Sequence, residues 1–179
     1  GLAAGSLLVL KAQNMLEPYT PRDFAELSPV MRDASESPCW VGINAWATAF
    51  CVNRPEMEKR GLAAPRNWEE LARPEYKELI VMPDPAASGT GYMNLAAWMQ
   101  MWGEEKAWAY VDAVRANLKM FSPSGARPAA MAAQGGVPRG VSSGAFGAPF
   151  VKRRAPLDII VPDNAGWEME ACAIVRGTA

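Results

Sequence analysis

Short apolar segments alternate with polar segments along the chain, and this alternation predicts strands and helices in turn. The expected strands lie at 79–82, 120–121, 137–143, 157–161 and 168–175. The expected helices lie at 6–16, 67–71, 93–102, from 104 onward, and at 129–134. Helices that lie between strands act as crossover connections, so we expect an α/β fold with a mostly parallel, twisted sheet and flanking helices.

Four segments add detail to this pattern. The run 40–53 is too long for an ordinary strand, and its aromatic and β-branched residues predict two strand segments or one strand crossing between lobes. Residues 20–38 are polar and rich in proline, which is typical of a surface linker. The helix at 93–102 is apolar nearly all round and should be buried. The next helix has an expected apolar stripe of Ala107 or Trp108, Val111, Val114 and Leu118.

A loop of small and hydroxyl residues joins the expected strand at 79–82 to the helix that follows it. The first turn of a helix has unpaired backbone N–H groups and partial positive charge. The hydroxyls add donors, and the glycines allow a ligand to approach the backbone closely. We therefore expect an anion seat, for phosphate, phosphonate or carboxylate, made of Ser88, Gly89, Thr90, Gly91 and Tyr92. In the alternative, Ser88 or Thr90 only caps the helix while the glycines form the turn.

A second loop of the same kind follows the strand at 120–121. Its candidate residues are Ser122, Ser124, Gly125 and Ala126, and alone they also suit simple helix capping. In open α/β sheets, ligands gather beyond the carboxyl ends of the strands, where helix N-termini face a shared crevice. Two such loops in one sheet therefore favour a binding function.

Composition excludes several other classes of function. The net charge is −1 and the sequence pI is about 5.6, and the basic residues are scattered, so nucleic acid is not an expected partner. The chain has no His, and its three Cys have no Cys-x-x-Cys spacing, so we expect no zinc, haem or other cofactor and no Cys-His catalysis. One disulfide with an odd thiol is possible, but Cys51 and Cys172 lie in apolar strand-like runs typical of free thiols.

Three segments resemble a known family. The first runs from Trp68-Glu69-Glu70-Leu71 to the Pro-Asp-Pro that ends the strand at 79–82. The second combines Ser88–Tyr92 with the run 103–108, and the third combines 166–170 with 173–177. Together these segments resemble the extracellular solute-binding proteins of bacterial ABC importers, in the branch that includes 2-aminoethylphosphonate, phosphorylated-sugar and iron(III) binders.

The resemblance implies a type II periplasmic-binding-protein fold, in which two α/β lobes joined by crossover strands close on a ligand. Residues 1–39 would be a remnant of the first lobe and a linker, and 40–53 the crossover region. Residues 54–167 would form the second lobe, and 168–179 the return crossover strand. We therefore expect a fragment of mainly the second lobe, which should bind anions weakly without the rest of the first lobe.

Departures from the family pattern bear on the ligand. Iron(III) binders have a neighbouring Tyr pair where this chain has Ala145-Phe146, so iron is not expected. Ser142 and Ser143 offer neutral hydroxyls that suit an oxyanion or a sugar. Four further side chains have both a binding and a purely structural interpretation: Arg127 as an anion partner, the Glu168 and Glu170 pair as an ammonium partner, and Trp46 (or Trp40) as a cleft residue.

The resemblance implies a periplasmic or extracellular protein, monomeric and not an enzyme, that captures a small anionic solute for an ABC transporter membrane permease. Phosphonates and phosphorylated compounds are the preferred solutes. The alternatives are a ligand-sensing domain of a regulator with the same fold, or a binder of carboxylate or polyamine solutes. An enzyme acting on a nucleotide is disfavoured, because no Gly-Lys-Ser/Thr follows the glycine loop.

Overall fold

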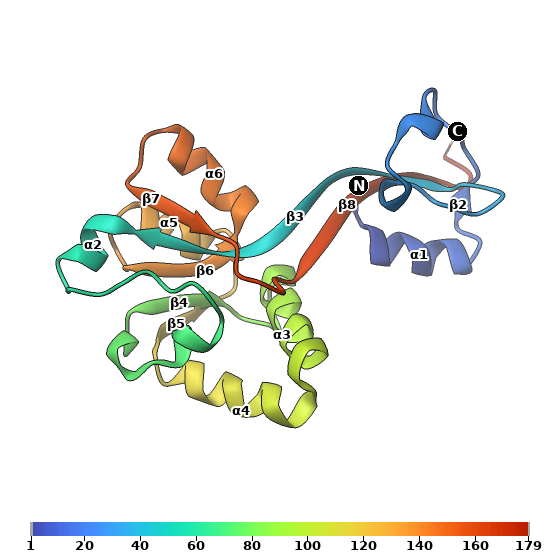
Figure 1. Ribbon diagram of the computed structural model, residues 1–179. Coiled ribbons are helices and arrows are strands. Elements are labelled where there is room, and N and C mark those ends of the chain that lie inside the picture. The colour runs from blue at the N-terminus through green and yellow to red at the C-terminus, as the bar shows by residue number, and fades with distance from the viewer. Residues whose placement is uncertain (1, 179) are drawn as a thin grey trace. The chain divides into compact units, whose positions relative to one another are not determined.

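The computed structural model describes residues 2–178, which form two compact units (Figure 1). The first unit contains the residues up to Trp46 together with those from Glu168 onward, and the second is Ala47–Trp167. Two strands pass the boundary between the units: β3 (Trp40–Asn53) and β8 (Trp167–Val175). The run 40–53 is thus one continuous strand, which was one of its two predicted forms.

The first unit is small and is built around β8. Two short strands, β1 (Leu2–Ala3) and β2 (Leu16–Glu17), pair with β8 in antiparallel fashion. Helix α1 (Ala4–Ala12) packs on a small core that includes Leu7, Leu16 and Trp40. The linker contains only two 3-10 turns, η1 (Phe24–Glu26) and η2 (Pro29–Met31). The expected helix at 6–16 was too long, because Asn14 has a left-handed backbone (φ 56°) and Leu16 pairs with β8.

The sheet of the second unit has the strand order β7–β3–β6–β4–β5. Its strands are β4 (Ile80–Pro83), β5 (Leu118–Ser122), β6 (Arg139–Ser143) and β7 (Leu157–Ile160), together with the second half of β3. Strand β4 runs parallel to both β5 and β6, while β3 is antiparallel to β6 and β7. The predicted α/β fold is confirmed, and the sheet is mixed: β4, β5, β6 and β7 point in the same direction, and β3 runs opposite to them.

Helices connect these strands as crossovers. They are α2 (Arg54–Glu58), α3 (Gly89–Trp102), α4 (Glu104–Arg115), α5 (Arg127–Ala133) and α6 (Gly144–Lys152), with 3-10 turns η3 (Glu69–Ala72) and η4 (Pro74–Tyr76). The sequence did not predict α2 or α6. Both are short, α6 has Pro149 inside it, and each is started by a side-chain cap, Asn53 for α2 and Ser143 for α6. Their stability therefore depends on caps and packing more than on local propensity.

The main core of the second unit is a chain of aromatic rings. Phe50 on β3 meets Trp68 edge to face with ring centroids 4.9 Å apart, and Trp68 meets Trp98 at 5.4 Å. Trp98 in turn meets Tyr110 on α4 at 4.9 Å. The choice of Trp108 for the stripe of α4 was wrong: Trp108 is 46% exposed, and the buried positions are Ala107, Tyr110 and Val114.

Helix α3 is fully buried along one face only, and most other positions of the expected helix at 93–102 are half-buried. Thr90, Asn94 and Trp98 are each at most 5% exposed, whereas Tyr92 is 58% exposed. The four-residue spacing of the buried positions places them on one stripe of the helix. Two of these three residues are polar, which is unusual for the buried side of a helix.

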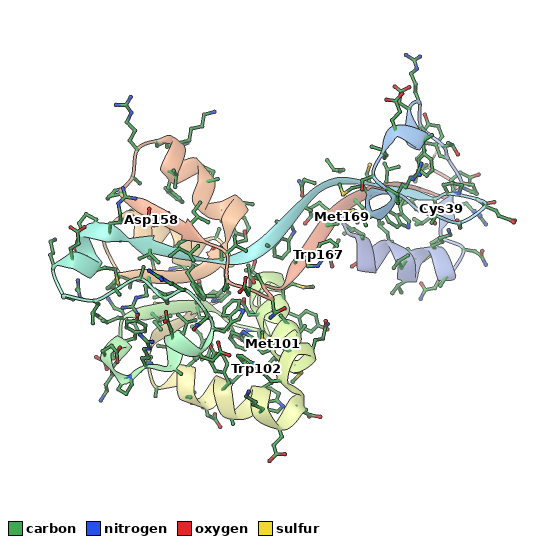
Figure 2. All side chains as sticks on the ribbon, in the orientation of Figure 1. Cys39, Met101, Trp102, Asp158, Trp167 and Met169 are labelled. Atoms are coloured by element: carbon green, nitrogen blue, oxygen red, sulfur yellow. The ribbon has the colours of Figure 1, made fainter. Side chains whose placement is uncertain are left out.

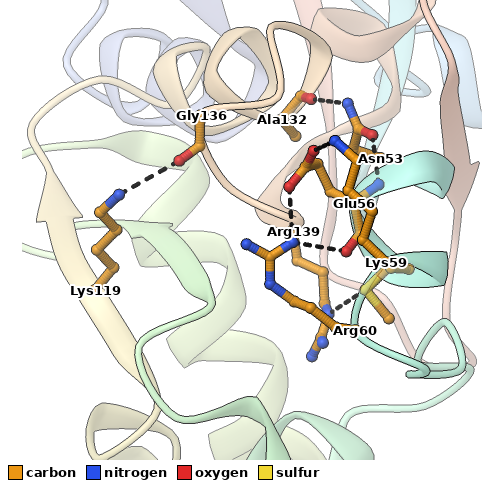
Figure 3. Close-up of polar contacts among 9 residues, drawn as sticks. Asn53, Glu56, Lys59, Arg60, Lys119, Ala132, Gly136 and Arg139 are labelled. Atoms are coloured by element: carbon orange, nitrogen blue, oxygen red, sulfur yellow. Dashed lines mark hydrogen bonds and ion pairs between the residues drawn. The ribbon is translucent and has the colours of Figure 1, made fainter.

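Arg139, at the start of β6, is a buried cation, and no carboxylate within residues 2–178 forms an ion pair with it (Figure 3). Its Nε donates to the sulfur of Met57 at 3.2 Å, and its guanidinium lies 3.2 Å from the centroid of the Tyr76 ring. Both terminal nitrogens are buried and have no hydrogen-bond partner within residues 2–178. Desolvation lowers the pKa of Arg139 to about 10, from an ordinary value of 12.5.

We expect Arg139→Met to raise the free energy of unfolding by about 1–4 kcal/mol, because an apolar residue of similar length removes a buried, unpaired charge. The pKa of Arg139 in the folded protein is depressed to about 10. The buried charge of Arg139 therefore destabilises the fold fully below pH 10, and this destabilisation lessens between pH 10 and the ordinary pKa of 12.5. Urea unfolding at pH 7 measures the effect. The exposed Arg153→Met is the matched control and should be nearly neutral; a large loss of stability in Arg139→Met would contradict the prediction.

Candidate anion-binding site

The parallel strands β6, β4 and β5 end at the same edge of the sheet. Each is followed by small polar residues and then by a helix, namely α6, α3 and α5 respectively. None of these helices has an acidic residue in its first turn. The first turns of these helices therefore add no negative charge of their own, and the acidic residue at this edge is Asp84, whose carboxylate accepts from the Ala86 amide at 2.8 Å.

The anion seat occupies the start of α3. Ser88 is the N-cap residue, but its side chain makes no capping hydrogen bond. Within residues 2–178, the amides of Gly89, Thr90 and Gly91 and the hydroxyl of Thr90 likewise make no hydrogen bond. The simple capping alternative thus leaves the donors at this helix start unexplained.

Two details of the anion seat differ from the expectation. The amide of Tyr92 donates to the Ser88 carbonyl at 2.9 Å, so this amide belongs to the helix ladder and is not a spare donor. Gly91 has a packing role, because a Cβ atom there would lie 2.7 Å from the Pro83 carbonyl oxygen and from Asp84. Glycine is required here by the close approach of α3 to the end of β4.

The second loop lies directly against the anion seat. A Cβ atom on Gly125 would lie 2.4 Å from the Thr90 hydroxyl oxygen and 3.1 Å from the Ser88 hydroxyl oxygen. The two loops that the sequence singled out are therefore in contact, and Gly125 leaves the space into which both hydroxyls point. Ser122 is fully buried, and its hydroxyl closes a local turn by donating to the Ser124 carbonyl at 3.1 Å.

The two serines at the end of β6 complete the arrangement but use their hydroxyls internally. Ser142 donates to the Gly125 carbonyl at 2.6 Å, which fixes the second loop against β6. The Ser143 hydroxyl accepts from the Phe146 amide at 3.4 Å and caps α6. The hydroxyls of Ser122, Ser142 and Ser143 therefore hold the loops at this edge of the sheet through hydrogen bonds. The hydroxyls of Ser88 and Thr90 make no hydrogen bond within residues 2–178 and are called uncommitted below.

The remaining candidates are spread over the chain. Ser124 and Arg127 are exposed, and Ala126 is the N-cap residue of α5. Trp46, Trp40, Glu168 and Glu170 all belong to the first unit. Trp40 is a core residue of that unit, and Glu168 accepts from the Met169 amide through its own side chain at 2.8 Å.

The cysteines Cys39, Cys51 and Cys172 are all free thiols. Cys51 is fully buried on β3, and burial raises the pKa of its thiol to about 12. Cys172 is only half-buried, and with Cys39 it lines an apolar cavity of about 200 Å³ in the first unit. No cysteine pairing is therefore favoured.

A separate groove of about 390 Å³ lies along α3 in the second unit, and two of its lining residues, Met101 and Trp167, are labelled in Figure 2. Its lining includes Met93, Ala97, Met101 and Trp167, and no residue of the serine and glycine loops. Within residues 2–178, no group of three or more His, Cys, Asp or Glu side chains could hold a metal ion. In the same residues, no helix is both long and apolar enough to cross a bilayer.

Comparison with known proteins identifies the class. The family model described as bacterial extracellular solute-binding protein matches residues 4–177, so the chain belongs to this family. Its fold is that of the type II periplasmic binding proteins, and the resemblance drawn from the three sequence segments is confirmed.

Three similar proteins illustrate the relationship. An uncharacterised protein of Haemophilus influenzae is 28% identical over 171 residues, which cover 91% of this chain and 48% of the relative. The structure of the periplasmic binding protein AfuA from Actinobacillus pleuropneumoniae, with fructose-6-phosphate bound, is 28% identical with a TM-score of 0.81. That alignment covers 94% of this chain and 54% of AfuA.

The third is the phosphoglycerate transport regulatory protein PgtC of Salmonella typhimurium, 28% identical over 71 residues, or 40% of this chain and 18% of PgtC. The chain thus spans about half the length of the relatives that it matches most fully.

Proposed function

We propose that the protein, at its natural length, captures a small anionic solute that carries a phosphonate or phosphate group. It would do so as the periplasmic or extracellular solute-binding component of an ABC importer, without catalysis, and would deliver the solute to a membrane permease as a monomer. The observation that carries this proposal is the contact between Thr90, Ser88 and Gly125. It places two uncommitted hydroxyls and the free amides of a helix start at one point.

The chemistry of this point suits an oxyanion. Hydroxyl and amide N–H donors at a helix N-terminus, close to glycine backbone, match the acceptor oxygens of phosphate. The direct ligand contacts are proposed to be Ser88, Gly89, Thr90, Gly91 and Gly125. Supporting positions are Ser122, Ser142 and Ser143, with Tyr92, Ser124 and Ala126 as further contacts from the same unit; a ligand contact by Trp46 of the first unit stays a prediction. The solutes in the names of AfuA and PgtC, fructose-6-phosphate and phosphoglycerate, agree with this chemical class.

Calorimetry on the natural-length protein tests the proposal. The ligand panel consists of inorganic phosphate, 2-aminoethylphosphonate and fructose-6-phosphate, each compared with a matched compound that lacks the phosphorus group, such as fructose. We expect binding that requires the phosphorus oxyanion. Tighter binding of dicarboxylates or polyamines would favour the alternative solutes, and binding to none of the panel would contradict the proposal.

A second candidate function is ligand sensing within a regulatory system, and the word "regulatory" in the name of PgtC favours it. Solute capture predicts that the protein stimulates ATP hydrolysis by its cognate importer when the solute is bound. Sensing predicts that the solute alters the activity of a signalling partner instead. The two functions would use the same anion seat, so seat variants do not distinguish them.

A further inference from the structure

The groove of about 390 Å³ along α3 has the size of a small-molecule subsite. Ligand pockets in proteins typically have volumes of about 300–1,000 Å³, with apolar surface and a few polar groups that fix the orientation of the ligand. Met93, Ala97 and Met101 supply the apolar surface, and Gln100 and Asn164 bring amide groups. None of the residues that line the groove has a charged side chain. The groove therefore suits an uncharged group.

The groove begins one helical turn beyond the anion seat. Met93 is the lining residue nearest to the start of α3, and it follows Gly89 by four residues. The two positions therefore lie on one side of the helix, about 6 Å apart along its axis. Met101 lies about 12 Å further along the axis. A ligand that has its oxyanion at the anion seat can thus extend along α3 into the groove.

The wall of the groove opposite α3 reaches the same edge of the sheet as the anion seat. The carbonyl of Gly166 accepts from the Thr48 amide at 2.8 Å, and Thr48 pairs with Ser143, the last residue of β6. A Cβ atom on Gly166 would lie 2.5 Å from the Met93 carbonyl oxygen and 3.3 Å from the Ala97 Cβ, so this wall packs directly on α3. The groove and the anion seat therefore border one edge of the sheet.

Trp167 gives the groove a flat aromatic surface (Figure 2). The side chain is 59% exposed, so much of its ring is available to a ligand. An indole ring has a large apolar face that packs well against the C–H groups of a sugar or polyol. The amide groups of Gln100 and Asn164 can donate hydrogen bonds to hydroxyl oxygens and accept from hydroxyl protons.

We propose that this groove is a second subsite, which holds the uncharged, hydroxylated carbon skeleton of a solute whose phosphate or phosphonate group occupies the anion seat. This inference rests on the proposed function, and it narrows the class of solute. An ammonium group in the groove would lose water without gaining a carboxylate from the lining, which is unfavourable. The structure thus favours phosphorylated sugars and polyols over aminoalkyl phosphonates.

The first test is Trp167→Ala in the natural-length protein, titrated in a calorimeter with fructose-6-phosphate and with inorganic phosphate. Wild type should bind fructose-6-phosphate at least about tenfold tighter than phosphate, because only the sugar compound reaches the groove. Trp167→Ala should lose at least about tenfold in affinity for fructose-6-phosphate while phosphate stays within about threefold of wild type.

The matched control is Trp108→Ala, which removes a tryptophan of α4 that is 46% exposed and does not line the groove. This variant should bind both compounds as wild type does. The inference is overturned if Trp167→Ala binds fructose-6-phosphate with wild-type affinity, or if it loses affinity for both compounds by the same factor.

A second variant fills the groove instead of removing one surface. Ala97→Phe places a ring in the groove and should lower the affinity for fructose-6-phosphate to that for inorganic phosphate. Its phosphate affinity should stay within about threefold of wild type, which also shows that the anion seat is folded. Ala113→Phe makes the same change at an exposed position of α4 and should have no effect on either compound. A full preference for fructose-6-phosphate in Ala97→Phe would contradict the inference.

A matched pair of ligands tests the charge of the skeleton. Glucose-6-phosphate and glucosamine-6-phosphate differ by a hydroxyl in one and an ammonium in the other. Wild type should bind glucose-6-phosphate at least about threefold tighter, and equal or tighter binding of the amino sugar would overturn the assigned class. Wild type that binds no phosphorus compound would refute the proposed function itself. Wild type that binds phosphate as tightly as it binds sugar phosphates would refute only the second subsite.

Discussion

Gly125→Val should abolish high-affinity binding of phosphate compounds, with a loss of about 100-fold or more, because it disturbs two hydroxyl donors at once. A Cβ atom at this position would meet the Thr90 oxygen at 2.4 Å and the Thr90 Cβ at 3.0 Å, and the Ser88 oxygen is only 3.1 Å away. Either the side chains rotate out of the anion seat or the second loop moves away from α3. Both outcomes remove the donors from the position that a ligand oxyanion would take.

The measurement is calorimetric titration of the natural-length variant with fructose-6-phosphate, accompanied by thermal unfolding. Overpacking should cost about 1–3 kcal/mol of stability, which leaves a folded protein to titrate. Gly136→Val is the matched control, because a Cβ atom there meets only the Met131 carbonyl oxygen at 3.4 Å. Gly125→Val that retains wild-type affinity would show that the ligand does not use this junction.

The positions of the two loops could be predicted from sequence because their signals are local. Apolar runs followed by Ser-Gly-Thr-Gly and Ser-Pro-Ser-Gly-Ala specify a strand, a turn and a helix start, and β4 with α3 and β5 with α5 have this order. Parallel pairing of neighbouring strands then places the ends of β4 and β5 at one edge. The contact of Gly125 with Thr90 follows from that topology.

The specific use of each hydroxyl could not be predicted, because it depends on contacts between distant residues. Ser142 looks like a ligand donor in the sequence, yet its partner is the Gly125 carbonyl, 17 residues away. Likewise, Tyr110 replaces Trp108 in the core because Trp98 and Trp102 supply its aromatic neighbours from another helix. The groove along α3 has no local motif at all, because residues 164–167 meet α3 only in the fold.

Thr90→Val should weaken phosphate binding by about one to two decades while the fold survives. The substitution retains the shape of the side chain against Gly125 but removes the only proton that Thr90 can donate, and a hydrogen bond to a charged group contributes roughly 1.5–3 kcal/mol. The structure also predicts that Thr90→Val changes the free energy of unfolding very little. Since the Thr90 hydroxyl makes no hydrogen bond within residues 2–178, its loss removes no cap from α3, and the free energy of unfolding should stay within about 0.5 kcal/mol of wild type.

Titration of the natural-length Thr90→Val protein beside wild type, with circular dichroism as the folding control, gives both quantities. Thr20→Val alters a threonine of the linker in the first unit and serves as the matched variant, with no expected change in affinity. Thr90→Ser retains the hydroxyl and should bind within about threefold of wild type. Unchanged affinity of Thr90→Val in an intact fold would reduce this loop to a helix start and would place the solute site elsewhere, since the buried hydroxyl of Ser142 at Gly125 already donates to the Gly125 carbonyl.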